Sequence, residues 1–274
     1  MNRKRSDKNK LPEEMLTETE INRLIDAATG PKFKAFVSML YETGCRISEL
    51  IFMQIRNIRF DKYGAIINVP PVKTGPRRIR IVSSVPLLTE WMNVHPDKNN
   101  PAAYLWPSNQ KKIISYGGVY SILEKIAKKA GVKKRVNPHN FRHSRATYLA
   151  NYLTEAQMKE YFGWYQDSDM ASIYVHLSGR DVDNAILGVY GIKNDEKPEK
   201  SVLSPKSCTR CKTDNPATNK FCSLCGMPLD TETANKIIQN EVDMGKASSM
   251  LDELIKDPEF REIFVSKAMG YMKK

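Results

Sequence analysis

The sequence predicts a mainly α-helical fold with a small antiparallel β-hairpin or sheet, followed by a small metal-binding module. Three observations predict this combination. Capping patterns precede several segments whose apolar residues recur at helical spacing, one short region alternates like strands, and two C-x-x-C pairs stand near the C-terminal end.

Composition points to a polyanionic partner. The 274 residues include 43 Lys and Arg against 31 Asp and Glu, which gives a net charge of +12. An excess of this size favours nucleic acid over a membrane surface, although a merely basic soluble protein is the alternative. No apolar run approaches the roughly 20 residues that span a bilayer. The charged N-terminus lacks the apolar core of a signal peptide, so we expect a cytoplasmic protein.

The first predicted elements are a basic arm and three helices. Residues 1–14 are expected to be a flexible basic arm, which either touches a DNA backbone or is a solvated tail. Thr17 and Glu20 form a capping box for a first helix, which Gly30-Pro31 ends. A second helix is predicted over residues 34–42. Gly44 breaks it, and Arg46 opens the next helix.

The pattern then changes to that of strands. Residues 65–69 and 78–82 are rich in β-branched residues and predict an antiparallel hairpin, with a third strand near residues 58–60. The turn between them contains Lys73 and Gly75-Pro76. On turn chemistry alone, Lys73 reads as an ordinary turn lysine.

Helical patterns return after the hairpin. Helices are predicted over residues 85–94 and 118–130, and Pro138 begins another at a position that proline tolerates. Thr154 and Gln157 make a capping box for the helix that leads to Gly163-Trp164, and Ile186 and Leu187 suggest a last helix. The helix predicted over residues 118–130 and the turn after it carry basic residues that face either phosphates or solvent: Lys125, Lys128, Lys129, Lys133, Lys134 and Arg135.

One stretch, from Pro138 to His176, gathers the chemistry. His139 and Arg142 lie one helical turn apart and leave the same helix face. An indole at Trp164 and a phenol at Tyr174 follow within a short span. A cation, an imidazole, an indole and a phenol could together build a site for a phosphodiester, whereas each residue alone fits a surface or packing role equally well.

Together with upstream motifs, this stretch resembles the tyrosine recombinase (phage-type integrase) family, especially archaeal integrases. That family carries arginine in T-G-x-R-x-x-E, lysine on a β-hairpin, H-x-x-R, G-H or G-W, and then tyrosine. Residues 43–49 read TGCRISE, and the other motifs follow in the same order over roughly residues 15–190. The matching catalytic positions are Arg46, Lys73, His139, Arg142, Trp164 and Tyr174.

The resemblance implies the catalytic-domain fold of tyrosine recombinases and a DNA breakage-and-rejoining reaction. Tyr174 would attack the scissile phosphate and form a covalent 3′-phosphotyrosine. Arg46 and Arg142 would clamp the phosphate oxygens, while Lys73 would protonate the departing 5′ oxygen. His139 would assist proton transfer and Trp164 would donate a hydrogen bond to the phosphate. Glu49 would orient an arginine or histidine, and neither ATP nor a metal would take part in the chemistry.

The resemblance also implies partners and leaves rival functions open. We expect double-stranded DNA and a homo-oligomer, a tetramer on DNA. The family carries a helical core-binding domain before the catalytic domain, and only about fourteen residues precede it here. We therefore expect either a minimal or truncated integrase or a partner chain that supplies that domain. Tyr174 could act in cis or in trans. The alternatives are a catalytically weak DNA-binding regulator of integration and a nicking-closing enzyme like type IB topoisomerases.

The C-terminal part predicts a zinc site. Cys208, Cys211, Cys222 and Cys225 form two C-x-x-C pairs, which in a reducing compartment favour a structural zinc ion over disulfides and resemble a zinc ribbon. Such a module could contact DNA or protein. Cys45, the fifth cysteine, is expected to pack in the core. The predicted division of the chain is an arm over 1–14, a catalytic domain over 15–194, a linker over 195–206, a zinc ribbon over 207–228 and a helical tail over 229–274, which could dock in cis or on a neighbouring subunit.

Overall fold

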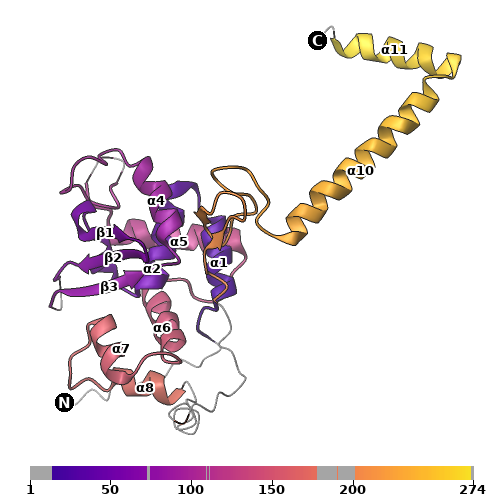
Figure 1. The fold of residues 1–274 in the computed structure, drawn as a ribbon. Coiled ribbons are helices and arrows are strands. Elements are labelled where there is room, and N and C mark those ends of the chain that lie inside the picture. Colours follow the sequence, from indigo (N-terminus) through magenta and orange to yellow (C-terminus); the bar gives the residue numbers. More distant parts are fainter. Residues whose placement is uncertain are drawn as a thin grey trace. The chain divides into compact units, whose positions relative to one another are not determined.

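The computed structural model describes residues 14–72, 75–108, 110, 112–177, 190 and 201–272. Within these ranges the chain forms two compact units, one of residues 1–206 with 214–218 and one of residues 207–213 with 219–274 (Figure 1). Four predictions lie outside the described residues: the basic arm up to residue 13, Lys73, the helix near Ile186 and Leu187, and the linker up to residue 200. The predicted fold class, mainly helical with a small antiparallel sheet, is confirmed.

Two helices begin the first unit. Helix α1 (Glu18–Ala27) starts with the predicted capping box, in which Thr17 accepts from the Glu20 backbone and the Glu20 carboxylate accepts from Thr17. Helix α2 (Gly30–Thr43) begins four residues earlier than predicted. Gly30-Pro31 was interpreted only as a helix stop, but proline suits the first turn of a helix, where its missing N–H costs nothing. The same dipeptide therefore separates α1 from α2 and starts α2.

A three-stranded antiparallel sheet follows the short helix α3 (Ile47–Ile51) and the 3-10 turn η2 (Ile55–Asn57). Its strands are β1 (Ile58–Asp61), β2 (Gly64–Val69) and β3 (Arg77–Ile81), in the order β1-β2-β3. The register pairs Arg59 with Ile66 and Ile66 with Arg80 on one face. On β3, burial alternates strictly, so Arg77 is buried on the face of Ile79 and Ile81.

Five further helices of this unit are described after the sheet. They are α4 (Val85–Asn93), α5 (Tyr116–Ala130), α6 (Pro138–Leu149), α7 (Glu155–Phe162) and α8 (Met170–Leu177). Helix α6 begins at Pro138 as predicted, and α7 has the predicted capping box of Thr154 and Gln157. Of the basic residues on and after α5, Lys134 is not free for a phosphate, because its Nζ binds Glu20 Oε2 at 2.9 Å and the Met15 carbonyl at 2.8 Å.

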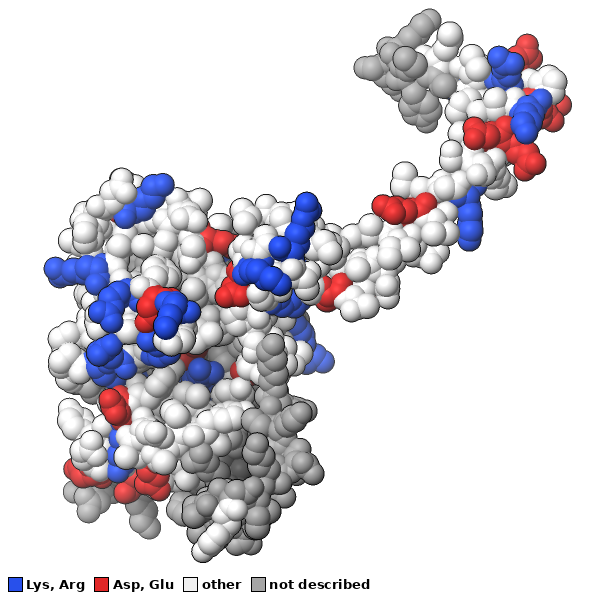
Figure 2. Space-filling model, viewed as in Figure 1, with Lys and Arg blue, Asp and Glu red and all other residues white. Residues whose placement is uncertain are grey.

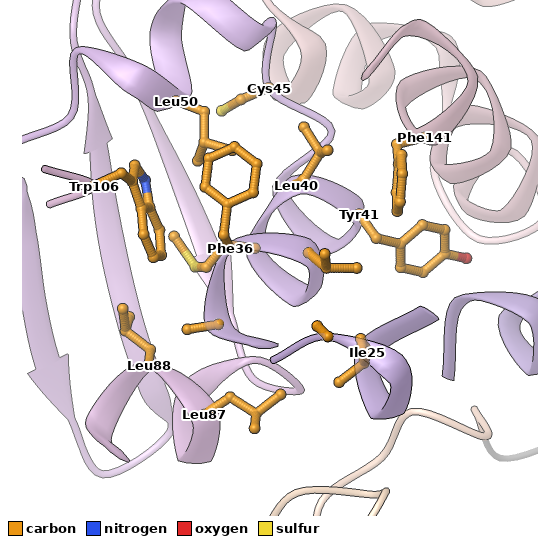
Figure 3. Close-up of a cluster of buried hydrophobic side chains, with 14 of the residues drawn as sticks. Ile25, Phe36, Leu40, Tyr41, Cys45, Leu50, Leu87, Leu88, Trp106 and Phe141 are labelled. Atoms are coloured by element: carbon orange, nitrogen blue, oxygen red, sulfur yellow. The ribbon is translucent and has the colours of Figure 1, made fainter. Parts of the chain in front are cut away.

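The core of the first unit is built around α2. Its apolar residues pack against α1, α4, α6 and the inner face of the sheet, and Phe36 meets Trp106 edge to face with ring centroids 5.2 Å apart (Figure 3). Cys45 is fully buried there, which confirms the predicted packing role. A second, smaller cluster joins α6, α7 and α8, and consists of Ala146, Ala150, Met158, Phe162, Ala171 and Tyr174.

Residues 201–206, the last part of the predicted linker, pack on the first unit. Leu203 is buried in the core, and the hydroxyl of Ser201 donates to both carboxylate oxygens of Glu18 at 2.8 and 2.9 Å. The backbone N–H of Val202 also donates to Glu18 at 3.1 Å. Polar composition predicted a linker here, but one buried leucine and a helix-terminal carboxylate are enough to fix this segment.

The C-terminal part contains short strands and two helices. Strands β4 (Lys206–Ser207) and β5 (Asp214–Asn215) form a two-stranded sheet, and α10 (Thr231–Leu254) and α11 (Pro258–Met272) follow. Asp230 caps α10 by accepting from the Thr233 N–H at 2.8 Å. Among the described residues, no helix is long and apolar enough to cross a membrane.

Candidate active site

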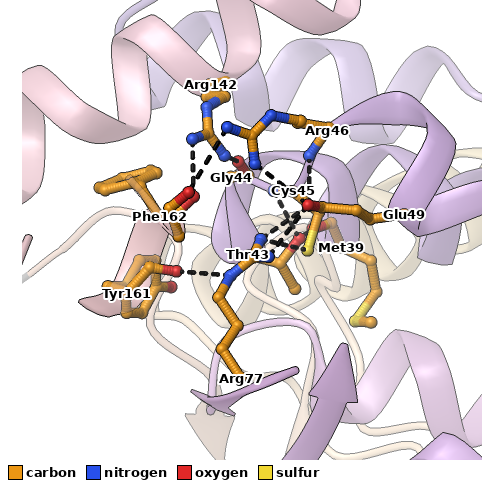
Figure 4. Close-up of polar contacts among 11 residues, drawn as sticks. Met39, Thr43, Gly44, Cys45, Arg46, Glu49, Arg77, Arg142, Tyr161 and Phe162 are labelled. Atoms are coloured by element: carbon orange, nitrogen blue, oxygen red, sulfur yellow. Dashed lines mark hydrogen bonds and ion pairs between the residues drawn. The ribbon is translucent and has the colours of Figure 1, made fainter. Parts of the chain in front are cut away.

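Arg46 is fixed where α2 ends and α3 begins. Gly44 ends α2 in the left-handed conformation with φ of 54°, and Arg46 is the N-cap of α3. The Arg46 backbone N–H donates to Glu49 Oε2 at 2.9 Å, and its Nη1 donates to Glu49 Oε1 at 3.1 Å. The carboxylate of Glu49 therefore holds both the backbone and the guanidinium of Arg46 (Figure 4).

A second arginine, Arg77 of β3, meets the same carboxylate. Its Nη2 and Nη1 donate to Glu49 Oε2 and Oε1 at 2.7 and 3.0 Å, a bidentate pair, and its Nε donates to the Tyr161 carbonyl at 3.0 Å. Burial alone would raise the pKa of Glu49, but the hydrogen bonds and charges of Arg77 and Arg46 hold it below its ordinary value. Glu49 is thus an anion that positions two guanidinium groups, as predicted for one.

Arg142 of α6 approaches from the other side. Its Nη1 donates to the Gly44 carbonyl at 2.8 Å and its Nη2 to the Phe162 carbonyl at 2.7 Å, at the ends of α2 and α7 (Figure 4). Desolvation, followed by the like charges of Arg46 and Arg77, lowers the pKa of Arg142 to about 10. An anion bound beside Arg142 would relieve this repulsion.

A pocket opens beside these arginines. It has a volume of about 320 Å³, and its lining includes Arg46, Ser48, His139 and Arg142, with Tyr116 and Tyr120 of α5. Arg46, His139 and Arg142 were predicted to act together from separate motifs. The fold brings all three to this pocket because α3 and α6 both begin at it.

Tyr174 and Trp164 form a stack next to Arg142. Their rings are nearly parallel, with an interplanar angle of 3° and centroids 5.7 Å apart. Trp164 also stacks on Phe162, and the Arg142 guanidinium carbon lies 5.6 Å from the Trp164 ring centroid. Tyr174 is 6% exposed, and burial raises its pKa to about 12, against a lowering effect of Arg142. At the hydroxyl end, Tyr174 is hydrogen-bonded to Nδ1 of His143.

Lys73 lies outside the described residues, but both sides of its turn are described. A cavity of about 470 Å³ has Gly75, Pro76 and Arg77 on the side of the hairpin and Gly163, Trp164 and Tyr165 on the side of α7. Residues 75–77, which lead into β3, therefore line the same cavity as Trp164.

Comparisons with known proteins agree with this geometry. Residues 14–180 match the model of the family described as "Phage integrase family". The chain belongs to the phage integrase family. Tyrosine recombinase XerA of Pyrococcus furiosus is 30% identical over 176 residues, which are 62% of this chain and 60% of XerA. A tyrosine recombinase of Thermosipho africanus is also 30% identical, over 65% of this chain and 62% of its own.

Solved structures agree as well. A crystal structure of XerA recombinase matches with a TM-score of 0.52 and 28% identity, over 70% of this chain and 66% of that one. A XerH site-specific recombinase matches in fold, with a TM-score of 0.53 and 21% identity over 67% of this chain and 55% of that one. The chain spans about 60% of the length of the curated relatives it matches.

Two residues of this site, Arg77 and His143, were not predicted from the sequence to belong to it. For Arg77 the signal was the alternation of RRIRI, which places it on the face of Ile79 and Ile81. His143 is four residues after His139 on α6. That spacing was the signal that could have linked His143 to the site.

The four cysteines of the C-terminal part lie outside the integrase match and form their own cluster. Their sulfur atoms all lie within 4.8 Å of one another, with Cys208 and Cys225 Sγ 3.6 Å apart and Cys211 and Cys222 Sγ 3.5 Å apart. A tetrahedral zinc with bonds of about 2.3 Å requires sulfur atoms about 3.8 Å apart. The donor set and spacing therefore fit zinc.

The two cysteine pairs have matching turns. Lys212 N–H donates to the Cys208 carbonyl and Gly226 N–H donates to the Cys222 carbonyl, both at 3.0 Å. Lys212 and Gly226, which directly follow the second cysteine of each pair, both adopt positive φ, at 60° and 73°. Each pair thus ends in the same left-handed turn, which aims its two thiols at a common point.

Proposed function

We propose that the chain is a site-specific DNA recombinase that cleaves and rejoins DNA through a covalent 3′-phosphotyrosine intermediate. One observation carries the proposal: the pocket and the phenol are adjacent. Arg46, His139 and Arg142 line a single pocket, the Arg142 guanidinium lies over the ring of Trp164, and that ring stacks on the buried phenol of Tyr174. The similarity to XerA and to another tyrosine recombinase supports the same reaction class.

The charge of the pocket supports a phosphate as its ligand. Arg46 and Arg77 both pair with the carboxylate of Glu49, and their charges also act on Arg142, so the cluster has an excess of positive charge in a partly desolvated place. Arg46 and Arg142 reach the pocket, whereas Arg77 is held on Glu49. A phosphodiester would compensate the positive charge of Arg46 and Arg142, and two planar guanidinium groups suit its non-bridging oxygens.

Each candidate catalytic side chain takes one part of the proposed reaction. Tyr174 attacks phosphorus while the bond to the 5′ oxygen breaks, and Lys73 protonates that oxygen. Arg46 and Arg142 stabilise the charge that develops on the phosphate. His139 assists at the phosphate, and Trp164 offers its indole N–H to an oxygen. Because the phosphotyrosine conserves the bond energy, a second 5′-hydroxyl can attack it without ATP or metal.

Double-stranded DNA is the proposed partner, bound by a homo-oligomer that reaches a tetramer during exchange. Arg59, Arg78 and Arg80 lie exposed on one face of the sheet, and Figure 2 shows Lys and Arg gathered over β1–β3. Such a surface suits the phosphate backbone. Acting on DNA would place the protein in the cytoplasm with the nucleoid, and the resemblance to archaeal integrases suggests an archaeal mobile element as its setting.

Zinc is the proposed ligand of Cys208, Cys211, Cys222 and Cys225, in a zinc ribbon over residues 207–228. When bound, it would supply structural cross-linking only, since a module of this size buries too little apolar surface to fold without its metal. The sulfur spacing supports this assignment. We retain the predicted division into a catalytic domain over 15–194 and a helical tail over 229–274 as part of this proposal.

A nicked suicide substrate without added metal tests the function. Wild-type protein should form a denaturation-resistant adduct with DNA, and Tyr174→Phe should form none while it binds DNA nearly as well, because it lacks only the nucleophilic oxygen. Binding without any adduct would favour the DNA-binding regulator. An adduct that rejoins within one duplex but never transfers to a second would favour a nicking-closing enzyme. An adduct in Tyr174→Phe would place the nucleophile elsewhere, with Tyr165 the first residue to check.

A further inference from the structure

His143 and Tyr174 are joined across two helices. His143 lies on α6, directly after Arg142, and its Nδ1 is hydrogen-bonded to the Tyr174 hydroxyl on α8. Their ring centroids are 6.0 Å apart with an interplanar angle of 41°. The phenol is therefore held on its face by Trp164 and at its oxygen by His143.

A buried phenol needs an acceptor for its proton. Burial raises the pKa of Tyr174 to about 12, so the hydroxyl is protonated at neutral pH. When its oxygen bonds to phosphorus, the proton must leave for a base within hydrogen-bonding distance. His139, four residues earlier on α6, lies on the lining of the arginine pocket, whereas His143 contacts the oxygen that would react.

We propose that His143 is a catalytic residue: the general base that takes the Tyr174 proton during DNA cleavage and returns it during rejoining. The proposal rests on the proposed recombinase function. His143 starts neutral, with its proton on Nε2 and its Nδ1 lone pair directed at the phenol. As the Tyr174 oxygen–phosphorus bond forms and the bond to the 5′ oxygen breaks, the phenolic proton moves to Nδ1.

Each proton then has a donor and an acceptor in both cleavage and rejoining. The departing 5′ oxygen receives its proton from a separate acid, for which Lys73 is the candidate. In the reverse step the attacking 5′-hydroxyl gives its proton back to that same acid, now deprotonated, and the Nδ1–H of His143 protonates the departing phenolate. This division leaves His139 for the phosphate and His143 for the nucleophile, one helical turn apart on α6.

Single-turnover cleavage of the suicide substrate by the full chain provides the first test. Wild type must form the adduct; if it does not, the recombinase function itself fails. If it does, His143→Asn and His143→Gln, which keep a polar side chain but no base, should cleave at least about 100-fold more slowly. Their DNA affinity and thermal unfolding should stay near those of wild type. Cleavage at the wild-type rate by either variant would overturn the proposal.

Two chemical substitutions separate a base from a structural support. Difluorotyrosine at position 174 loses its proton more readily, so it should restore much of the rate of His143→Asn and change that of wild type little. A 5′-bridging phosphorothiolate substrate, whose leaving group needs no acid, should not restore that rate. No recovery with difluorotyrosine, or recovery with the phosphorothiolate, would assign His143 another role.

A measurement on the unaltered histidine covers the case in which the variants misfold. With ¹⁵N-histidine labelling, the resonance of His143 Nδ1 should report an unprotonated, hydrogen-bonded nitrogen, and it should shift in Tyr174→Phe. Nδ1 found carrying the proton and donating to the phenol would exclude the base role, since the proton could then not move to it.

Discussion

At the scale of single residues, Arg46 and Arg142 should be sensitive to conservative change. Lysine keeps the charge but loses the planar fork, so Arg46→Lys and Arg142→Lys should each lower single-turnover cleavage about 100- to 1000-fold. Overall DNA affinity should fall much less, because many basic residues share the backbone contacts. Arg261→Lys, at an exposed position on α11, is the control and should leave the rate unchanged. Equal losses in rate and affinity would make both residues ordinary phosphate anchors.

Glu49 should contribute strongly to the stability of the site near neutral pH, where its carboxylate is ionised. Its carboxylate is fully buried against Arg77, and removing one partner of such a pair costs about 3–5 kcal/mol, so Glu49→Gln should lower the unfolding free energy by that order. Glu232→Gln removes an exposed pair on α10 and should cost less than about 1 kcal/mol. Urea unfolding of the full chain measures both.

The pH dependence follows from the lowered pKa of Glu49. Since the folded-state pKa lies below the ordinary value of 4.5, the unfolded chain binds a proton first as pH falls. The contribution of Glu49 is therefore fully present above about pH 4.5 and is lost as pH falls through the folded-state pKa. Wild type should lose more stability than Glu49→Gln over that window. Parallel curves for the two proteins would contradict the assignment.

The difference between Glu49 and Arg77 shows what a sequence can predict about single residues. Glu49 was identifiable because it stands three residues from Arg46 at the start of one helix. Arg77 meets the same carboxylate from 28 residues away, and only the burial alternation of its strand hints at this. Likewise, the contact of His143 with Tyr174 depends on how α6 packs on α8, which no local pattern encodes.

At the scale of elements, local capping was predictable and capping by distant residues was not. Thr17 and Thr154 begin their helices with partners three residues away, and both capping boxes were predicted. The turn that leads into helix α4 is capped instead by Glu42 of α2, whose carboxylate accepts from the N–H groups of Val82, Ser83 and Ser84 at 2.7 to 2.9 Å. Such a carboxylate satisfies backbone donors that no neighbour in sequence reaches.

The end of α2 offers a matched test of how the helices meet. Gly44 has φ of 54°, and a Cβ there would lie 2.5 Å from Phe162 Cε1, so Gly44→Ala adds a clash to backbone strain. Gly30 also has positive φ, at 74°, but a Cβ there meets nothing within 4 Å. Gly30→Ala should therefore cost about 1–2 kcal/mol, from strain alone.

Gly44→Ala should cost more than Gly30→Ala and should also slow cleavage, because Phe162 carries the Trp164 stack and its carbonyl binds Arg142. Thermal unfolding and adduct formation on the two variants provide the comparison. Equal destabilisation, with cleavage unaffected in both, would show that Phe162 moves aside without disturbing the site.

At the scale of the whole molecule, the chain separates chemistry from metal binding. The candidate catalytic side chains that the structure describes belong to the first compact unit, and the four cysteines of the cluster belong to the second. The predicted composition shift at the linker indicated such a division. Its boundary was less predictable, because Leu203 and the Ser201–Glu18 contact join residues 201–206 to the first unit.

Metal removal should therefore unfold the zinc module of the second unit and leave cleavage by the first unit unchanged. The full chain should contain one zinc, and Cys208→Ser should abolish stoichiometric zinc binding, whereas Cys45→Ala, which alters the remaining cysteine, should retain it. A strong chelator or Cys208→Ser should expose residues 207–228 to protease, since such a module folds only with its metal. The adduct with a suicide substrate should form at an unchanged rate at saturating DNA, because no step of the proposed chemistry uses a metal. Suppose that chelation stops cleavage at saturating DNA while the first unit remains folded. If Cys208→Ser shows the same loss, the zinc or the module that it folds takes part in the reaction. If Cys208→Ser cleaves normally, the reaction depends on a metal at a different site.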